Sequence, residues 1–284
     1  MTCLMVGFFP TYLLSACLFY VNDPVVDMRA SPSLESEVVS QTILAEKVSV
    51  ETQIGEWAYI LTPDQYPGWV PAKSLISRNK PYKASLKVSR LAAHVYAVKD
   101  IKFGPIKTLP FGSKLRLVES SDSRWLKVAL PDGKECYIQK GDVCPEKMTF
   151  AKKDLAPFSQ KFIGLPYTWG GRSSFGYNCS GFVQMLYNQI GVNLPRGSKQ
   201  QISDPRFKTV PIESAEPGDL VFFGKSKQKI AHVGLYLGNG TFIHSTTREL
   251  QPWIRISNLS QFCWSGHKDA TYSYRVFRQL VQEP

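Results

Sequence analysis

A short polar run, Asn178-Cys179-Ser180-Gly181, leads directly into an amphipathic helical pattern and so places a cysteine at the start of a helix. Asn178 is a good N-cap and Gly191 a good stop signal. The apolar residues that recur at helical spacing are Phe182, Val183, Leu186, Tyr187 and Ile190. Because the helix dipole favours an anion at this end, we expect the thiol pKa to fall below its ordinary value of about 8.5. A lone cysteine in such a helix is more often a packing residue, so its role depends on its partners.

Two of the four histidines, His232 and His244, lie in a segment that predicts a β-hairpin. A three-residue loop centred on Asn239 places His244 opposite Gly234. In that register His232 lies on the same face of the hairpin, one diagonal step away. A two-residue turn would instead place His244 opposite Leu235 and facing away from His232, because side chains alternate between faces. We predict the longer loop, which lets the two imidazoles cooperate.

A cysteine with two histidines can supply a nucleophile, a base and a group that orients the base. Cys179, His232 and His244 are also plausible zinc ligands, with water in a fourth position, and this is the weaker alternative. Sensitivity to thiol alkylation without sensitivity to chelators would separate the two chemistries. A cysteine that starts a helix is no requirement of a zinc site, so we expect a thiol enzyme with no metal and no cofactor.

Six motifs stand in the order typical of one family between about residues 155 and 280. They are Leu165-Pro166-Tyr167-Thr168-Trp169-Gly170-Gly171, Asn178-Cys179-Ser180-Gly181, Leu194-Pro195-Arg196, Pro217-Gly218-Asp219-Leu220-Val221-Phe222-Phe223, His232-Val233-Gly234-Leu235-Tyr236 and Phe242-Ile243-His244. This set resembles the NlpC-type cell-wall endopeptidases, which are cysteine peptidases of a minimal papain-like fold.

The resemblance implies hydrolysis of the bond between the side-chain carboxyl of D-glutamate and a diamino acid, such as diaminopimelate, in the stem peptides of bacterial peptidoglycan. A thiol amidase or acyltransferase that acts on another peptidoglycan bond or acyl donor is the alternative, because fold and nucleophile do not identify the leaving group. A non-catalytic wall-binding protein is disfavoured by the intact cysteine and histidines.

By the same resemblance, Cys179 is the nucleophile, His232 the base and His244 the group that orients it. Tyr167 and the backbone amide of the nucleophile would stabilise the tetrahedral oxyanion. The substrate contacts that the resemblance implies are Asn178, Ser180, Trp169, Arg196 and Ser198.

Two positions depart from the family pattern. Asn178 stands where most members carry aspartate directly before the cysteine, so the N-cap is kept and the charge is lost. Gly197 stands where members that grip a free amino terminus tend to carry an acidic residue. The enzyme therefore either accepts peptides still attached to glycan or anchors the amine elsewhere.

The first half of the chain contains a weak internal repeat of short alternating strands, which predicts two small β-barrels. Residues 21–78 and 82–147 resemble bacterial SH3-like modules, and 150–284 would be the peptidase domain. The predicted class is therefore α+β, with a papain-like domain behind two SH3-like barrels. Glu37 and Tyr66 of the first barrel resemble residues that hold the terminal alanine of the stem peptide.

The net charge of +11 favours an acidic partner. Acidic stem peptides fit this charge, and no arginine-rich tract, zinc finger or helix-turn-helix pattern supports nucleic-acid binding. Six cysteines imply no disulfide scaffold, although Cys136 and Cys144 could pair if geometry allows.

Residues 1–20 carry no charged side chain and predict an apolar leader or membrane anchor. Leu14-Ser15-Ala16-Cys17 resembles a lipoprotein cleavage box, whereas Pro10 and the lack of a preceding cation oppose export. We expect the bacterial cell envelope or periplasm, with a cytoplasmic location as the open alternative.

Overall fold

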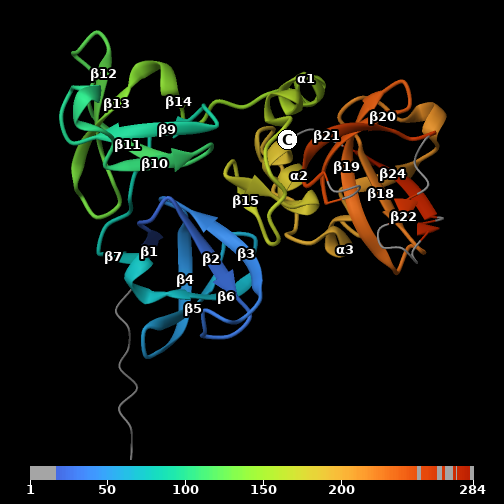
Figure 1. Ribbon diagram of the computed structural model, residues 1–284, viewed down its shortest axis with the longest axis horizontal. Coiled ribbons are helices and arrows are strands. Elements are labelled where there is room, and N and C mark those ends of the chain that lie inside the picture. The colour runs from blue at the N-terminus through green and yellow to red at the C-terminus, as the bar shows by residue number, and fades with distance from the viewer. Residues whose placement is uncertain (1–16, 248–250, 261–263, 266–270, 273, 282–284) are drawn as a thin grey trace, which may run out of the picture.

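The structure is a computed structural model that describes residues 17–247, 251–260, 264–265, 271–272 and 274–281. It contains two seven-stranded sheets in the first half of the chain and one six-stranded sheet, flanked by short helices, in the second half (Figure 1). Within the described residues no helix is long and apolar enough to cross a membrane.

The first sheet comprises β1 (Leu18–Val21), β2 (Val25–Arg29), β3 (Val38–Ile43), β4 (Lys47–Ile54), β5 (Trp57–Leu61), β6 (Pro67–Pro71) and β7 (Leu75–Arg78). Its strand order is β3-β2-β6-β5-β4-β1-β7. In β5 the buried residues Ala58 and Ile60 alternate with partly exposed ones, as a strand with one face on a core requires.

The second sheet comprises β8 (Leu86–Val88), β9 (Ala92–Tyr96), β10 (Lys107–Pro110), β11 (Lys114–Glu119), β12 (Trp125–Ala129), β13 (Glu135–Gln139) and β14 (Val143–Pro145). Its order, β10-β9-β13-β12-β11-β8-β14, repeats that of the first sheet strand for strand. Trp57 and Trp125 begin the equivalent strands β5 and β12. The internal repeat is therefore present in the topology.

The third sheet is antiparallel and has the order β17-β24-β18-β19-β20-β21. Its strands are β17 (Phe207–Val210), β18 (Leu220–Gly224), β19 (Ile230–Gly238), β20 (Thr241–Thr246), β21 (Trp253–Asn258) and β24 (Tyr274–Leu280). The helices of this half are α1 (Leu155–Ser159), α2 (Cys179–Asn188) and α3 (Ser198–Gln201). Two short antiparallel ribbons are also present. In one, β15 (Arg172–Ser173) pairs with β16 (Gly176–Tyr177), and in the other, β22 (Trp264–Ser265) pairs with β23 (Thr271–Tyr272).

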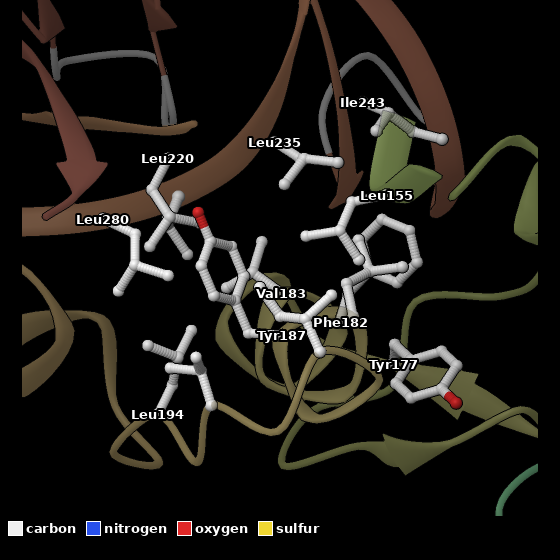
Figure 2. Close-up of a cluster of buried hydrophobic side chains, with 14 of the residues drawn as sticks. Leu155, Tyr177, Phe182, Val183, Tyr187, Leu194, Leu220, Leu235, Ile243 and Leu280 are labelled. Carbon is white, nitrogen blue, oxygen red and sulfur yellow. The ribbon is translucent and has the colours of Figure 1, made fainter. Parts of the chain in front are cut away.

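The apolar stripe of α2 packs on this third sheet, as its spacing predicts. Figure 2 shows Phe182, Val183 and Tyr187 of α2 among leucines contributed by the strands. Helix α2 ends at Asn188, and Gly191 follows with a φ of 79°. One stripe of the helix is thus fixed in the core, and this fixes the position of its first residue, Cys179.

The three sheets share apolar cores. Phe111, which follows β10, packs against Phe158 and Phe162 in the core of the third sheet. Tyr20 and Leu44 of the first sheet's segment are buried within the core of the second. Since each part completes the core of another, the first half of the chain is held against the helices that carry the site.

The predicted leader must end before Leu18. Leu18–Val21 is strand β1, which pairs with β4 and β7, so the boundary at residue 20 was wrong. The rest of the predicted leader, residues 1–16, lies outside the described residues. Cys136 is buried and Cys144 half-buried, and both are free, so the pairing left open by the sequence does not form.

A partly buried ion pair joins the first sheet to the ribbon before α2. Arg172 lies 3.1 Å from Glu46, and their side chains are only 17% and 13% exposed. We expect Arg172→Ala to lower the free energy of unfolding by about 3 kcal/mol, because it leaves Glu46 with an uncompensated charge. Urea denaturation measures this change. As a control, Lys127→Ala, which breaks an exposed pair with Glu135, should leave the midpoint nearly unchanged. Equal midpoints for Arg172→Ala and the parent chain would contradict the role of the pair.

Candidate active site

Cys179 is the first residue of α2 and is half-buried. The side chain of Asn178 caps the helix by accepting a hydrogen bond from the Gly181 amide at 2.8 Å. Asparagine therefore does the capping that the sequence assigned to it. The thiol is consequently held at a fixed place at the helix N-terminus.

Burial raises the pKa of the Cys179 thiol, which corrects the expectation that the helix start would lower it. The amides of Val233, Ser180 and Cys179 itself, together with the charge of Arg196, favour the thiolate and lower the pKa, but desolvation outweighs them. The contact with the Val233 amide also places the sulfur against strand β19, next to His232. A thiol in this environment needs a base to become a nucleophile.

The register of β19 and β20 is the one predicted, although the turn is shorter than predicted. Leu235 pairs with Ile243, so His244 lies opposite Gly234. The turn itself has two residues, Asn239 and Gly240, with φ values of 50° and 71°. A bulge between Tyr236 and Gly238 adds the residue that restores the register. The three-residue loop was therefore wrong, and the pairing deduced from it was right.

The two imidazoles form a hydrogen bond, and both are buried. His232 Nε2 lies 2.6 Å from His244 Nδ1, and His244 Nε2 lies 2.9 Å from Ser257 Oγ. If His232 carries its proton on Nε2 and donates it to His244, then His244 donates in turn to Ser257. That arrangement leaves Nδ1 of His232 as an unprotonated base. The geometry thus provides the orientation and the tautomer that a general base requires.

Ser257 was not identified from the sequence. It lies on β21 opposite Phe242, and this pairing brings its hydroxyl to the far side of His244. No motif around Ser257 marks it, and only the predicted pairing of a third strand with the hairpin could have pointed to it.

The contact between the histidines does not suit a shared zinc ion. Two nitrogen ligands on one tetrahedral zinc ion stand about 3.3 Å apart, given Zn–N distances near 2.05 Å. His232 Nε2 and His244 Nδ1 are 2.6 Å apart and face each other. The pair is therefore arranged for proton sharing, which favours the thiol chemistry over the zinc alternative.

Gly234 gives the histidine pair its space. A Cβ at this position would lie 2.8 Å from Cδ2 of Phe242 and 3.2 Å from Cβ of His244. A larger residue would push His244 out of its place between His232 and Ser257. The glycine within the His232-Val233-Gly234 motif is explained by this close approach.

Tyr167 lies beside Cys179. Its amide donates to the Pro252 carbonyl at 2.6 Å, and it forms a bridge with Tyr177 directly before the helix. Burial, and then the proximity of Cys179, raise the pKa of the phenol well above its usual value. The hydroxyl therefore stays protonated and can act as a hydrogen-bond donor in the site.

Arg196 is 4% exposed and joins the substrate contacts predicted around the cysteine. Its Nη1 donates to Asn178 Oδ1 at 3.1 Å and to Ser180 Oγ at 3.0 Å. Its Nη2 donates to the Gly170 carbonyl at 2.6 Å. Burial, and next the charge of Arg172, lower its pKa to about 10, so the guanidinium is still charged at neutral pH.

Ser198 opens α3 two residues beyond Arg196 and is half-buried. Among the described residues no side-chain hydrogen bond joins it to the other site residues.

The first sheet reaches the site through Glu37 and β3. Trp169 is 63% exposed, and its indole N–H donates to Glu37 Oε1 at 3.0 Å. Gly170 has a φ of 72°, and a Cβ there would lie 3.0 Å from the side chain of Val38. Tyr66 is near enough to Arg196 to affect its pKa. The structure therefore brings both first-sheet residues predicted from the sequence to the edge of the site.

Comparison with known proteins agrees with this geometry. The sequence matches the NlpC/P60 family over residues 164–272 and the bacterial dipeptidyl-peptidase SH3 domain over residues 28–75. It is 31% identical over 235 residues to the γ-D-glutamyl-L-lysine dipeptidyl-peptidase of Bacillus subtilis, covering 77% of this chain and 76% of that protein. A protein of the same name from Bacillus cereus is 30% identical over 236 residues, covering 75% of this chain and 69% of that protein.

Among solved structures, an NlpC/P60 family protein from Bacillus cereus superimposes with a TM-score of 0.79 at 24% identity. The match covers 93% of this chain and 100% of that one. At this identity the likeness establishes the fold.

The raised thiol pKa makes His232 necessary for reactivity at neutral pH. We expect His232→Ala to slow alkylation of Cys179 by iodoacetamide about tenfold at pH 7, because little thiolate forms below a raised pKa. In this variant the rate should keep rising with pH through about 8.5, the ordinary cysteine value. Peptide mapping by mass spectrometry measures the rate at Cys179. The exposed His94 provides the matched control, since His94→Ala should leave the rate unchanged. A plateau near neutral pH in the His232→Ala variant would contradict the raised pKa.

Proposed function

Since the chain belongs to the NlpC/P60 family of cell-wall hydrolases, we propose that it is a cysteine endopeptidase that cleaves the bond between γ-D-glutamate and the diamino acid of peptidoglycan stem peptides. The observation that carries the proposal is the hydrogen-bonded series His232, His244 and Ser257 beside a cysteine at a helix start. The diamino acid is diaminopimelate or, as in the names of the relatives, lysine.

In the first step Nδ1 of His232 accepts the thiol proton, and the Cys179 sulfur attacks the γ-carbonyl carbon of D-glutamate. The imidazolium is stabilised because its Nε2–H donates to His244, which donates to Ser257. The negative charge moves to the carbonyl oxygen. Tyr167, whose phenol remains protonated, and the Cys179 amide are the donors available to hold that oxygen.

In the second step the C–N bond breaks, and His232 returns the proton to the leaving amine of the diamino acid. A thioester between Cys179 and the γ-carboxyl remains. Water, deprotonated by the same imidazole, then hydrolyses the thioester and restores the thiol. Each proton that His232 accepts is passed on within the cycle, so no cofactor is needed.

Arg196 and the two serines beside it suit the α-carboxylate of D-glutamate, which stays free in a γ-linked peptide. Ser180 Oγ accepts from Arg196 Nη1, and its hydroxyl donates to Asn178 Oδ1 at 3.5 Å, a long hydrogen bond that it can exchange for one to a substrate carboxylate. Ser198 supplies a second hydroxyl from the start of α3. The buried guanidinium adds positive charge behind both groups, and this favours an anion at the site.

The amino end of the stem peptide lies best against the first sheet. Asn178 is neutral, and its Oδ1 already accepts from Gly181 and Arg196. Gly197 has no side chain and so supplies no carboxylate of its own. Glu37 remains as the carboxylate for the amine, with Tyr66 beside it.

The same proposal divides the chain into two SH3-like barrels, residues 18–78 and 82–147, and a papain-like domain, residues 150–284, with the start of the first barrel moved to include β1. The matched SH3 domain covers most of the first barrel, and the shared strand order supports the second. The family acts on the cell wall, so we place the protein at the bacterial cell envelope. A lipid attached at Cys17, directly before β1, would fit that place.

A thiol amidase or acyltransferase on another peptidoglycan bond remains the second candidate, because the same triad would serve it. The two differ in their products.

Digestion of purified muropeptides, with products identified by mass, tests the function. We expect wild-type protein to release products that end in D-glutamate and Cys179→Ala to lose activity about 10⁴-fold, since the nucleophile is removed. Cys144→Ala, which removes a half-buried free cysteine outside the site, is the control and should cleave normally. Intact muropeptides after digestion with wild-type protein would overturn the endopeptidase assignment.

The proposed role of Glu37 is tested by Glu37→Gln, which keeps an acceptor for Trp169 but removes the charge. We expect KM for peptides with a free amino terminus to rise about tenfold with kcat nearly unchanged, because a charged hydrogen bond is replaced by a neutral one. An N-acetylated peptide should show no such change. Glu35→Gln, on the same exposed loop, is the matched control. If KM is the same for Glu37→Gln and Glu35→Gln, the amine is held elsewhere.

A further inference from the structure

A cavity of about 790 Å³ lies where the first sheet, the second sheet and helix α2 meet. Gly181, Gln184, Met185 and Asn188 line it, so it is walled by the side of α2 that is turned away from the third sheet. Of the described residues around it, none is Cys179, His232 or Tyr167. The cavity is therefore separate from the active site, although it shares a helix with it.

The charged residues of the wall leave an excess of positive charge. Five cationic and three acidic side chains line the cavity: Lys47, Lys83, Lys114, Lys147 and Arg172 against Glu46, Asp64 and Glu146. Two of the acids are already paired, Glu46 with Arg172 and Glu146 with Lys114. The third, Asp64, accepts a hydrogen bond from Gln184 Nε2 at 2.7 Å. All three acids thus have partners within the protein.

Three lysines remain without an acidic partner in the part of the chain that the structure describes. Lys47 begins β4, Lys83 lies between the first and second sheets, and Lys147 follows β14. All three are exposed, and they reach the same cavity from three separate segments. Like charges brought together in this way repel one another, and an anionic ligand would relieve the repulsion.

The rest of the wall is largely apolar. Tyr20, Leu44, Tyr82 and Phe111 contribute to it, together with the half-buried Met185. The volume lies within the range of about 300 to 1,000 Å³ that is usual for small-molecule sites. A simple inorganic anion would leave most of this volume and the apolar surface unused.

We propose that this cavity is a second binding site, for an acidic peptide that places carboxylates on Lys47, Lys83 and Lys147 and apolar atoms against the wall. The proposal takes from the proposed function only the expectation that acidic stem peptides and their products surround the protein. Such a ligand contacts both sheets and α2 at once. The ligand would therefore bind only the folded chain, in which these parts are assembled, and would stabilise that chain against unfolding.

Isothermal titration calorimetry on full-length Cys179→Ala tests the site, with an α-linked tetrapeptide that has two central glutamates as the probe. This peptide lacks the γ-linkage of the proposed substrate. We expect binding that weakens as salt is added, and a melting temperature that rises with peptide concentration. Adding Lys47→Ala, Lys83→Ala and Lys147→Ala together should weaken binding at least about tenfold, since three charge contacts are lost.

The matched control replaces Lys153, Lys208 and Lys225, which are exposed and lie outside the cavity, by alanine and changes the net charge equally. It should bind the peptide as the parent does. Unchanged binding after the cavity substitutions, or equal weakening in both triple variants, would overturn the site. Sulfate that binds as tightly as the peptide would overturn the assignment to peptides. Muropeptide cleavage is measured separately, with the same lysine variants in a chain that keeps Cys179. Cleavage reports on the proposed endopeptidase function and peptide binding reports on the cavity, so failure of one proposal is distinguishable from failure of the other.

Discussion

The guanidinium of Arg196 is the contact on which the active-site arrangement depends. It is buried and donates to four acceptors, Ser40 Oγ in the first sheet, Asn178 Oδ1 and Ser180 Oγ at the start of α2, and the Gly170 carbonyl before it. Burying a cation is costly unless its donors are satisfied, so these partners hold one another in place. The helix start that carries Cys179, the loop that carries Tyr167 and Trp169, and the first sheet are thereby joined in one network.

The two sides of helix α2 contact different parts of the molecule. One side carries Phe182, Val183 and Tyr187 into the core of the third sheet. The other carries Gln184 to Arg172 and Asp64, and so to the first sheet. A helix held from both sides cannot rotate without breaking contacts in two parts of the molecule. The fixed position of Cys179 is therefore a property of the whole chain, including the sheets that precede the catalytic part.

Much of the site was predictable where local spacing determines the outcome. The cap at Asn178, the apolar stripe of α2 and the facing of His232 and His244 all follow from helical or strand periodicity. Ser257 was missed because its role depends on a strand pairing that leaves no mark in its own neighbourhood. The loop length was wrong because a bulge, which has no firm sequence signal here, compensated for a shorter turn.

The contacts of Arg196 with Ser40 and of Phe111 with the third sheet were likewise beyond prediction. Both join residues far apart in the chain, and neither requires a distinctive residue type at the partner position. The α+β class and the facing of His232 and His244 were therefore within reach of the sequence. The contacts by which the first and second sheets complete the site and the core beneath it could not be predicted from the sequence.

The thiol pKa explains why so extended a network is needed. Because burial raises that pKa, the helix start and the nearby amides cannot by themselves hold Cys179 as a thiolate. The base must therefore be already oriented when substrate arrives, and His232 is, through His244 and Ser257. The same burial keeps the phenol of Tyr167 protonated, so that in the proposed mechanism it can donate to the oxyanion. In the proposed mechanism, exclusion of water makes the Cys179 thiolate harder to form, but it also strengthens the hydrogen bonds that stabilise the transition state. The histidine pair offsets the cost of forming the thiolate, so the stronger hydrogen bonds can act on the transition state.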